Sequence, residues 1–204
     1  MDWREARRRG ARATIVSSAW DLVREEGLPA LSLRELARRS GITTPTVYAY
    51  FDSKNAIYDA MFADAAADFI GWMAEPVTTV DPGADLATDA RRFVEFCTAD
   101  IPRYQLLFQH TIPGFSPSTQ SYAPVVRALE RTRQLLQRSG VSDPRYLDLW
   151  TALTTGLVDQ QISNDPGGTR WSRLIDDAVR MFVSYCHDHK AVDADQRPSS
   201  SKST

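Results

Sequence analysis

Apolar side chains recur at helical spacing along most of the chain, and no strand-like alternation of useful length interrupts them. Ile15, Ala19, Leu22 and Val23 begin the pattern at positions i, i+4, i+7 and i+8, which share one face of a helix. Clusters of glycine, proline, asparagine and aspartate separate this stretch from the later ones. The spacing predicts an all-α fold of about nine helices.

Glycine stops divide the first sixty residues into a long helix followed by short ones. Gly27 ends the long helix, and Ser32 with Glu35 forms a capping box that opens a short one. Gly41 ends that helix after about two turns, and Pro45 suits the first turn of the next. A helix, a glycine turn and a second short helix are the sequence form of a helix-turn-helix, although an ordinary helical hairpin would share this corner.

Further helical stretches follow as far as the C-terminal tail. They are a stretch opened by Asp52-Ser53 and ending before Pro76, then Leu86–Thr98, Arg103–His110, Tyr122–Arg138, a stretch from Asp143 to Ile162, and Trp171–His187. Residues 191–204 are rich in serine and polar residues and are expected to be disordered. We therefore expect a three-helix N-terminal domain over residues 1–52, a helical bundle domain over residues 53–190, and a tail.

The composition is typical of a globular protein. The 204 residues are 43% hydrophobic and 25% charged, and their number corresponds to one or two domains. No stretch approaches the roughly 18 uninterrupted apolar residues that cross a membrane, and no apolar signal-peptide core follows the charged N-terminus. We expect a soluble, cytoplasmic protein. Cys97 and Cys186 are too few for a disulfide framework or a thiolate metal cage.

The net charge of −2 is unevenly distributed. Residues 1–60 hold ten Lys and Arg against eight Asp and Glu, so this part carries +2 and the rest carries −4. The predicted helix over residues 44–50 displays hydroxyl groups and aromatic rings and no acid. Such a helix can enter a major groove without repelling phosphates. The overall acidic balance is therefore compatible with a nucleic-acid partner.

Four runs in the N-terminal quarter carry a specific resemblance. They are ATIVSSA at residues 13–19, EGL at 26–28, LSLRELARRSGIT at 31–43 and VYAYFDSK at 47–54. Together they closely resemble the DNA-binding domain of the TetR-type repressor family. Six positions match the family pattern at the same time: Gly27, Ala37, Gly41, Tyr48, Phe51 and Lys54. The rest of the chain is similar to that family only in its helical architecture.

The resemblance implies a set of DNA-contacting residues. They are Arg34, Thr43, Thr44, Pro45, Thr46, Tyr48, Tyr50 and Lys54. Tyr48 resembles a phosphate-contacting tyrosine, or it is a packing ring with a hydrated hydroxyl. Arg34 resembles a position that reaches guanine in some members, or it is a solvated helix charge. The basic segment Arg7–Arg12 could lie along the DNA backbone or minor groove, or form a solvated helix start.

The family also implies a homodimer, because one module of this size contacts few base pairs. An apolar face on the last two helices is the candidate dimer interface: Leu149, Leu153, Leu157, Ile175, Val179, Phe182 and Val183. These residues could equally serve the core of one protomer.

A small-molecule effector of unknown identity is expected among the central helices. Its candidate lining is apolar and aromatic with a few polar groups: Trp72, Phe93, Phe96, Cys97, Tyr104, Phe108, His110, Trp150, Thr154 and Gln160. A packed core without a ligand is the alternative for each of them.

An enzyme is not expected. The sequence lacks a nucleophile elbow, a phosphate-binding glycine loop and an HExxH motif, and His187 and His189 point to different faces of a helix. Neither a cofactor nor a metal is expected. The resemblance to the TetR-type family implies a sequence-specific transcription regulator, a repressor that an effector releases from a near-palindromic operator. A helical structural protein without DNA binding is the alternative, although it would need neither the basic arm nor the hydroxyl-bearing helix.

Overall fold

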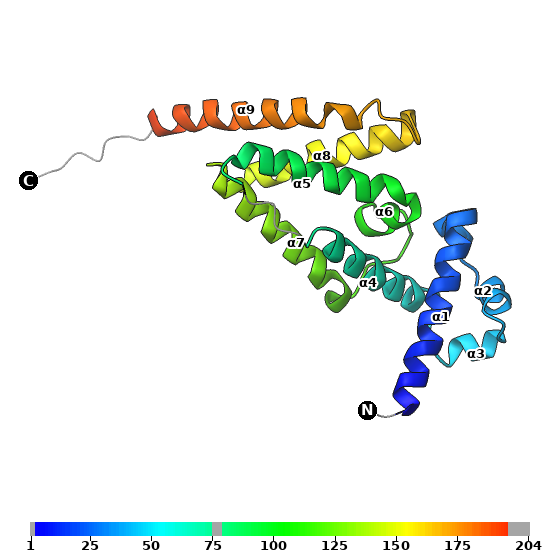
Figure 1. Cartoon of the computed structure of the whole chain (residues 1–204). Coiled ribbons are helices and arrows are strands. Elements are labelled where there is room, and N and C mark those ends of the chain that lie inside the picture. Colours follow the sequence, from blue (N-terminus) through cyan, green and yellow to red (C-terminus); the bar gives the residue numbers. More distant parts are fainter. Residues whose placement is uncertain (1–2, 75–78, 196–204) are drawn as a thin grey trace, which may run out of the picture. The chain divides into compact units, whose positions relative to one another are not determined.

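The structure is a computed structural model that describes residues 3–74 and 79–195. Within these ranges all regular elements are helices, so the predicted all-α fold is confirmed (Figure 1). The elements are α1 (Trp3–Glu26), η1 (Leu28–Ala30), α2 (Leu33–Arg39), α3 (Thr44–Tyr48), α4 (Lys54–Trp72), α5 (Pro82–Ala99), α6 (Ile101–Phe108), α7 (Thr119–Arg138), α8 (Arg145–Asn164), η2 (Ser172–Leu174) and α9 (Ile175–Asp195).

Side-chain caps confirm three of the predicted helix starts. The hydroxyl oxygens of Ser32, Thr43 and Ser53 each accept a hydrogen bond from the backbone N–H three residues later, at 3.5, 3.3 and 3.1 Å. The turns between these helices need a left-handed backbone, and Gly27 and Gly41 have φ angles of 85° and 66°. The local signals therefore determine where the N-terminal helices begin and end.

The C-terminal helix differs from its prediction at both ends. Residues 172–174 form the 3₁₀ helix η2, and α9 continues to Asp195 instead of ending at His187. The expected disordered tail therefore starts too early, because Ala191 and Ala194 favour a helix and no glycine or proline stops it before Pro198. Residues 196–204, and the helix stop predicted at Pro76, lie outside the described residues.

Contacts divide the chain into two compact units. The first comprises Met1–Ala74 and Phe96–Arg127, and the second comprises Glu75–Glu95 and Ala128–Thr204. Helices α4 and α6 thus pack with the N-terminal helices. The functional boundary at residue 52 remains a prediction.

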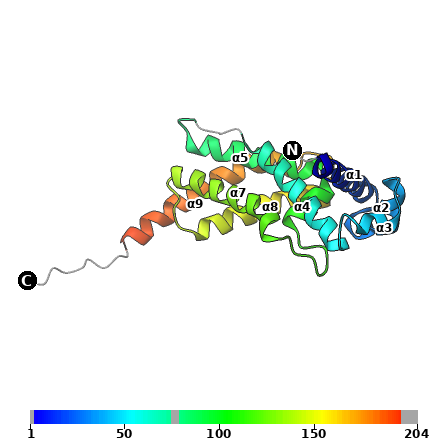
Figure 2. The same ribbon diagram turned by 90° about the horizontal axis from the view of Figure 1, so that it is seen from below.

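The first unit is built on the long helix α1. Figures 1 and 2 both place α2 and α3 beside it, and α4 packs against it as well. Its core includes the fully buried side chains of Ile15, Leu22, Leu36 and Val47. Val47 anchors α3, and Pro45 and Tyr48 of the same short helix are exposed.

A buried hydrogen bond ties α4 to the turn after α1. Tyr58 is 1% exposed, and its hydroxyl donates to the backbone oxygen of Leu28 at 2.7 Å. Burial raises the pKa of Tyr58 to about 12, so the group stays a neutral donor at physiological pH.

Replacing Tyr58 with Phe is expected to lower the free energy of unfolding by about 1–3 kcal/mol, because the buried oxygen of Leu28 loses its donor. Urea denaturation followed by circular dichroism measures this change. Tyr122→Phe, at a tyrosine that is 40% exposed and not part of a proposed interface, is the matched control and is expected to change stability little. Equal effects of the two substitutions would contradict the structural role of the Tyr58 hydroxyl.

Aromatic packing and the hydrogen bonds of the buried Asp85 carboxylate hold the second unit together. Phe182 of α9 packs against Trp150 of α8 with ring centroids 5.1 Å apart. Asp85 of α5 accepts hydrogen bonds from the N–H and hydroxyl of Thr79 and from Arg138 of α7. Burial raises the pKa of Asp85, but these hydrogen bonds outweigh it and hold the pKa below its usual value.

Candidate nucleic-acid interface

Helix α3 presents a short polar face. Thr43 and Pro45 are exposed, Thr44 and Thr46 are half-buried, and the first turn contains no acidic residue. The hydroxyl groups of Thr43 and Thr46 lie 2.8 Å apart and share a hydrogen bond. This bond fixes both hydroxyl oxygens at the start of the helix, where each can still contact a base edge or a phosphate oxygen.

Tyr48 lies at the end of α3 with its ring 50% exposed. Within the described part of the chain its hydroxyl has no hydrogen-bond partner, so a phosphate oxygen can accept from it. The alternative of a packing ring fits this exposure poorly. Tyr50 is half-buried beyond the end of the same helix.

Lys54 opens α4, but its ammonium group is not fully extended into solvent. Its Nζ lies 3.5 Å from the backbone oxygen of Pro29 and 5.5 Å from the centre of the Tyr58 ring. These contacts hold the positive charge at the N-terminus of α4, where exposed N–H groups also favour an anion. An ammonium group has three donors, so it can keep the contact with Pro29 and still bind a phosphate.

Positive charge also dominates α2. Arg34 is exposed, while Glu35 is bound by Arg38 at 2.6 Å and by Arg39 at 2.9 Å. Hydrogen bonds from Arg38 and Arg39 lower the pKa of Glu35 to about 2. Only one half of the predicted capping box forms. The Ser32 hydroxyl caps α2, but the Glu35 carboxylate pairs with arginines on its own helix instead of reaching back to Ser32. This pairing also neutralises the acid that would otherwise lie beside Arg34.

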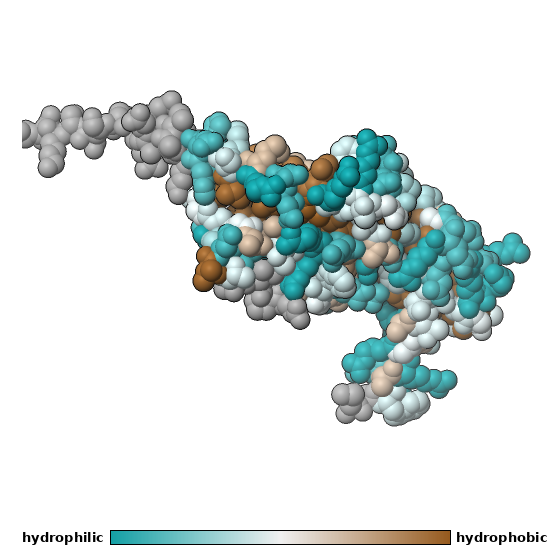
Figure 3. All heavy atoms as spheres, turned by 45° about the horizontal axis from the view of Figure 1, so that its top comes forward, coloured by the Kyte–Doolittle hydropathy of each residue, from teal (hydrophilic) through white to brown (hydrophobic). Residues whose placement is uncertain are grey.

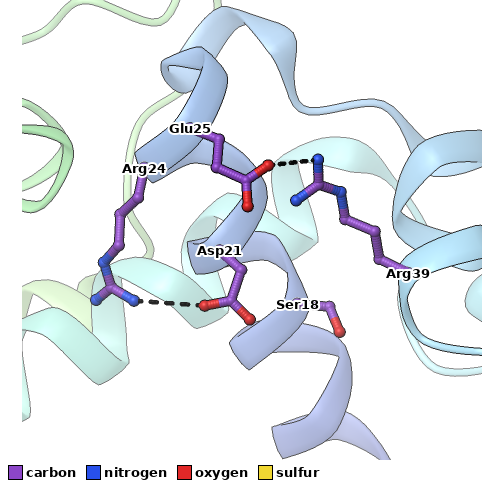
Figure 4. A pocket seen from close by; sticks show the side chains of 5 residues that line it. All are labelled: Ser18, Asp21, Arg24, Glu25 and Arg39. Carbon is purple, nitrogen blue, oxygen red and sulfur yellow. Dashed lines mark ion pairs between the residues drawn. The ribbon is translucent and has the colours of Figure 1, made fainter.

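A shallow hollow of about 400 Å³ opens on the same unit, between the end of α1 and α2 (Figure 4). Its lining is polar and charged: Ser18, Asp21, Arg24, Glu25 and Arg39. Arg24 pairs with Asp21 and Arg39 pairs with Glu25, as the dashed lines show. An apolar ligand would have to break these ion pairs, so this hollow does not fit the expected effector.

The predicted dimer residues fall into two groups in the second unit. Ile175, Val179 and Phe182 are at most 4% exposed and form the contact of α9 with its own protomer. They have little surface left for a second copy. Leu149 is 43% exposed, and the other three residues, Leu153, Leu157 and Val183, are half-buried.

Side chains that are apolar and exposed or half-buried form a second face on each of the last two helices, and this face includes Leu149 and Leu153 of the predicted interface. On α8 this face carries Leu149, Ala152, Leu153 and Gly156, at positions i, i+3, i+4 and i+7. On α9 it carries Ala178, Met181 and Tyr185, of which Met181 is 63% and Tyr185 44% exposed. We call these seven residues the outer face. Figure 3 shows brown, hydrophobic side chains among teal ones on the side of the molecule that includes α9.

Sequence reasoning missed Met181 and Tyr185. Both lie one step around the helix from the buried residues of α9, so the apolar pattern alone does not separate the core from the outer face. The exposure of two large apolar side chains on one helix is the signal that distinguishes them, and it requires the structure.

The predicted effector residues are divided between the two units. In the first unit Phe96 and Phe108 each pack against Phe69, with ring centroids 5.1 and 5.3 Å apart, and Tyr104 packs against Phe108 at 5.9 Å. Cys97 is buried, whereas Trp72 is 51% exposed and His110 is exposed. Phe69 belongs to this cluster but was not among the predicted effector residues. Its spacing of four residues from Ala65 places it on the apolar face of α4, which was the sequence signal for it.

The remaining effector candidates lie in the second unit. Trp150 and Thr154 are buried, Phe93 is half-buried and Gln160 is exposed. The Thr154 hydroxyl donates to the backbone oxygen of Trp150 within its own helix at 3.0 Å. The effector site therefore stays a prediction.

Neither a membrane span nor a metal cluster is found in the described part of the chain. None of its helices is both long and apolar enough to span a membrane. No group of three or more His, Cys, Asp or Glu side chains among these residues could hold a metal ion.

An acid-free short helix that follows a glycine turn and is flanked by basic groups is typical of helix-turn-helix DNA-binding proteins. Comparison with known proteins agrees with this class. Residues 15–61 match the family described as bacterial regulatory proteins, tetR family. Residues 15–61 are therefore similar to the DNA-binding domain of TetR-type transcription regulators.

Curated relatives share mainly this domain. The tetracycline repressor protein class A from transposon 1721 of Escherichia coli is 40% identical over 48 residues, which cover 24% of this chain and 22% of that protein. The HTH-type transcriptional activator FasR of Mycolicibacterium smegmatis is 25% identical over 100 residues, covering 48% and 46% of the two chains. The chain thus spans about a quarter to a half of the length of these relatives.

Solved structures share the fold over nearly the whole chain. A tetR-family transcriptional regulator from Streptomyces coelicolor has a TM-score of 0.71 and 23% identity, and the match covers 96% of this chain and 86% of that one. FadR from Bacillus subtilis, solved with stearoyl-CoA, has a TM-score of 0.62, 16% identity and coverage of 84% and 97%. RolR, solved with resorcinol, has a TM-score of 0.60, 18% identity and coverage of 98% and 100%.

Proposed function

We propose that the protein is a homodimeric repressor that reads a near-palindromic operator and leaves it when a small molecule binds. One observation carries the DNA-binding part of this proposal. Helix α3 is anchored by buried Val47 and exposes Thr43, Pro45 and Tyr48 without an acid in its first turn. An exposed helix of this kind fits the major groove, which is about 12 Å wide.

The same geometry supports a division of roles. Thr44, Pro45 and Thr46 lie in the first turn of α3, the part of a recognition helix that contacts base edges. Tyr48 and Lys54 offer a hydroxyl and an ammonium group to phosphates. Such contacts position the helix-turn-helix domain of residues 1–52, here called the head, on the DNA without reading its sequence. Arg34, on the first turn of α2, is a second candidate for a base contact.

The outer face supports the dimer. Leu149 and Met181 are large apolar side chains exposed on two neighbouring helices, and Ala152 and Gly156 leave room for close approach of a partner helix. Four helices, two from each copy, would bury this surface. Because each head contacts few base pairs, the second head supplies the affinity that an operator needs.

The effector would act on the first unit, in which α4 and α6 pack together. The aromatic cluster of Phe69, Phe96, Tyr104 and Phe108 supports an apolar or aromatic ligand. The solved structures of FadR and RolR hold stearoyl-CoA and resorcinol, which is consistent with an organic ligand here. A ligand that displaces α4 would move Lys54 and change the spacing of the two heads. We place the protein in the cytoplasm, together with its DNA.

Gel shifts on genomic fragments across a salt series test the proposal. Site-selective binding that weakens as salt rises is the expected result. Thr46→Ala should change the ranking of sites, since it alters a base-reading position, whereas Ser163→Ala at an exposed position of α8 should not. Dimeric protein without any site preference would contradict the proposed function and favour a structural role.

A further inference from the structure

The first three turns of α1 form a basic extension of the head. Residues 3–10 are all exposed, and Figure 1 shows the start of α1, in dark blue, continuing beyond the level of α3. Residues 3–12 carry five arginines and one acid, Glu5. Glu5 lies in the first turn, where a negative charge stabilises the start of a helix. The extension is therefore a positively charged helix.

Arg12 fixes the orientation of this helix relative to the recognition helix. Its guanidinium donates a hydrogen bond to the backbone oxygen of Tyr50 and stacks on the Phe51 ring, 4.0 Å from the ring centre. Tyr50 and Phe51 directly follow α3. The side of α1 that carries Arg12 is therefore the side that faces the end of the recognition helix.

Helical geometry places the other arginines around this reference. At about 100° per residue, Arg8 lies about 40° and Arg9 about 60° from Arg12, whereas Arg7 lies about 140° away. Arg8 is also about 6 Å further along the axis than Arg12. A strand of duplex DNA offers one phosphate for about every 3.4 Å of its axis, so about 6 Å corresponds to roughly two phosphate steps along one strand.

We propose that the face of α1 carrying Arg8 and Arg9 is a second DNA-contact surface, which binds backbone phosphates next to those contacted from α3 and α4. The proposal rests on the proposed function and adds a surface to it. Its basis is charge complementarity and continuity with the α3 face through Arg12. The contact is independent of base sequence, so it adds affinity to every site.

Gly10 weakens the helix between the extension and the rest of α1. A Cβ at this position would meet no atom within 4 Å, so an alanine fits without a clash. Alanine favours a helix over glycine, and Gly10→Ala would therefore stabilise the helical form of the extension. If the extension binds DNA as a helix, this substitution should raise affinity by up to about fivefold for each head.

The test compares Arg8→Gln, Arg7→Gln and Gly10→Ala in the full chain, by fluorescence anisotropy with a labelled duplex carrying a selected site. Arg8→Gln should weaken binding about fivefold and reduce the salt slope of log K by about 2 for a dimer. Arg7→Gln removes the same charge from the opposite side of α1. It should reduce the salt slope by less than half of the change seen for Arg8→Gln. Gly10→Ala should strengthen binding.

Three results would overturn the proposal. They are an unchanged slope in Arg8→Gln, equal losses in Arg7→Gln and Arg8→Gln, and weaker binding in Gly10→Ala, which would indicate an extended arm. Thr46→Ala in the same assay separates a failure of the extension from a failure of the head. If Thr46→Ala alters site preference while Arg8→Gln has no effect, the proposed DNA contact of the extension is rejected and the proposed repressor function is retained. If the wild type shows no site preference, the proposed function itself fails.

Discussion

Changing Leu149 and Met181 together to Asp is expected to convert the protein into a monomer and to weaken operator binding at least about 100-fold. The two side chains are 43% and 63% exposed on the outer face, so in a dimer each copy would bury them against its partner. Four carboxylates would then lie in an apolar contact without partners, which is strongly unfavourable. A monomer presents one head to the DNA and loses the contribution of the second.

Light scattering measures the mass directly. The wild type should have twice the mass of the 22.9 kDa chain, and the double variant should have the mass of one chain. Gln137→Asp, at an exposed polar position of α7 that is not part of the outer face, is the control and should remain dimeric. Circular dichroism verifies that the double variant keeps its helices. A folded double variant that is still a dimer would exclude the outer face as the interface.

Tyr48→Phe and Lys54→Ala are expected to weaken binding to all DNA sites by similar factors. Loss of the Tyr48 hydroxyl removes one hydrogen bond to an anionic phosphate for each head, which corresponds to a decrease of about tenfold or more for a dimer. Lys54→Ala removes a phosphate contact from each head, so the salt slope should fall by about 2. Neither change should alter which sites are preferred, because both residues contact the backbone.

Arg127 supplies a matched charge control, since it is exposed on α7 outside the helix-turn-helix. Arg127→Ala changes the net charge as Lys54→Ala does and should leave the slope close to that of the wild type. Lys54 also contacts Pro29 and Tyr58, so the melting temperature of Lys54→Ala must be measured alongside. Unchanged affinity and slope in a stable Lys54→Ala variant would refute the docking geometry.

The N-terminal helices could be predicted from sequence because their signals are local. The left-handed turns at Gly27 and Gly41 and the caps at Ser32, Thr43 and Ser53 depend only on neighbouring residues. The side chain of Glu35 shows the limit of such signals. A capping box directs it toward Ser32, but two arginines on its own helix compete more strongly for a carboxylate.

The dimer surface could not be assigned from sequence. Helices α8 and α9 have apolar residues around more than half of their circumference, and periodicity does not tell which of them contact their own protomer. Phe182 is buried against Trp150, whereas the neighbouring Met181 remains exposed. The effector residues pose the same difficulty, since Phe96 and Trp150 fall in separate units although both are buried and aromatic.

Selection of DNA fragments from a random duplex pool, followed by sequencing, tests the central claim most directly. The expected result is an enriched near-palindrome, with two half-sites whose centres lie about one helical turn, roughly 34–36 Å, or a multiple of it, apart along the duplex. Thr46→Ala should enrich a different half-site with the same spacing, because the dimer sets the distance and α3 reads the bases. Absence of any enriched sequence, or a single half-site without a symmetric partner, would contradict a dimeric, sequence-reading repressor.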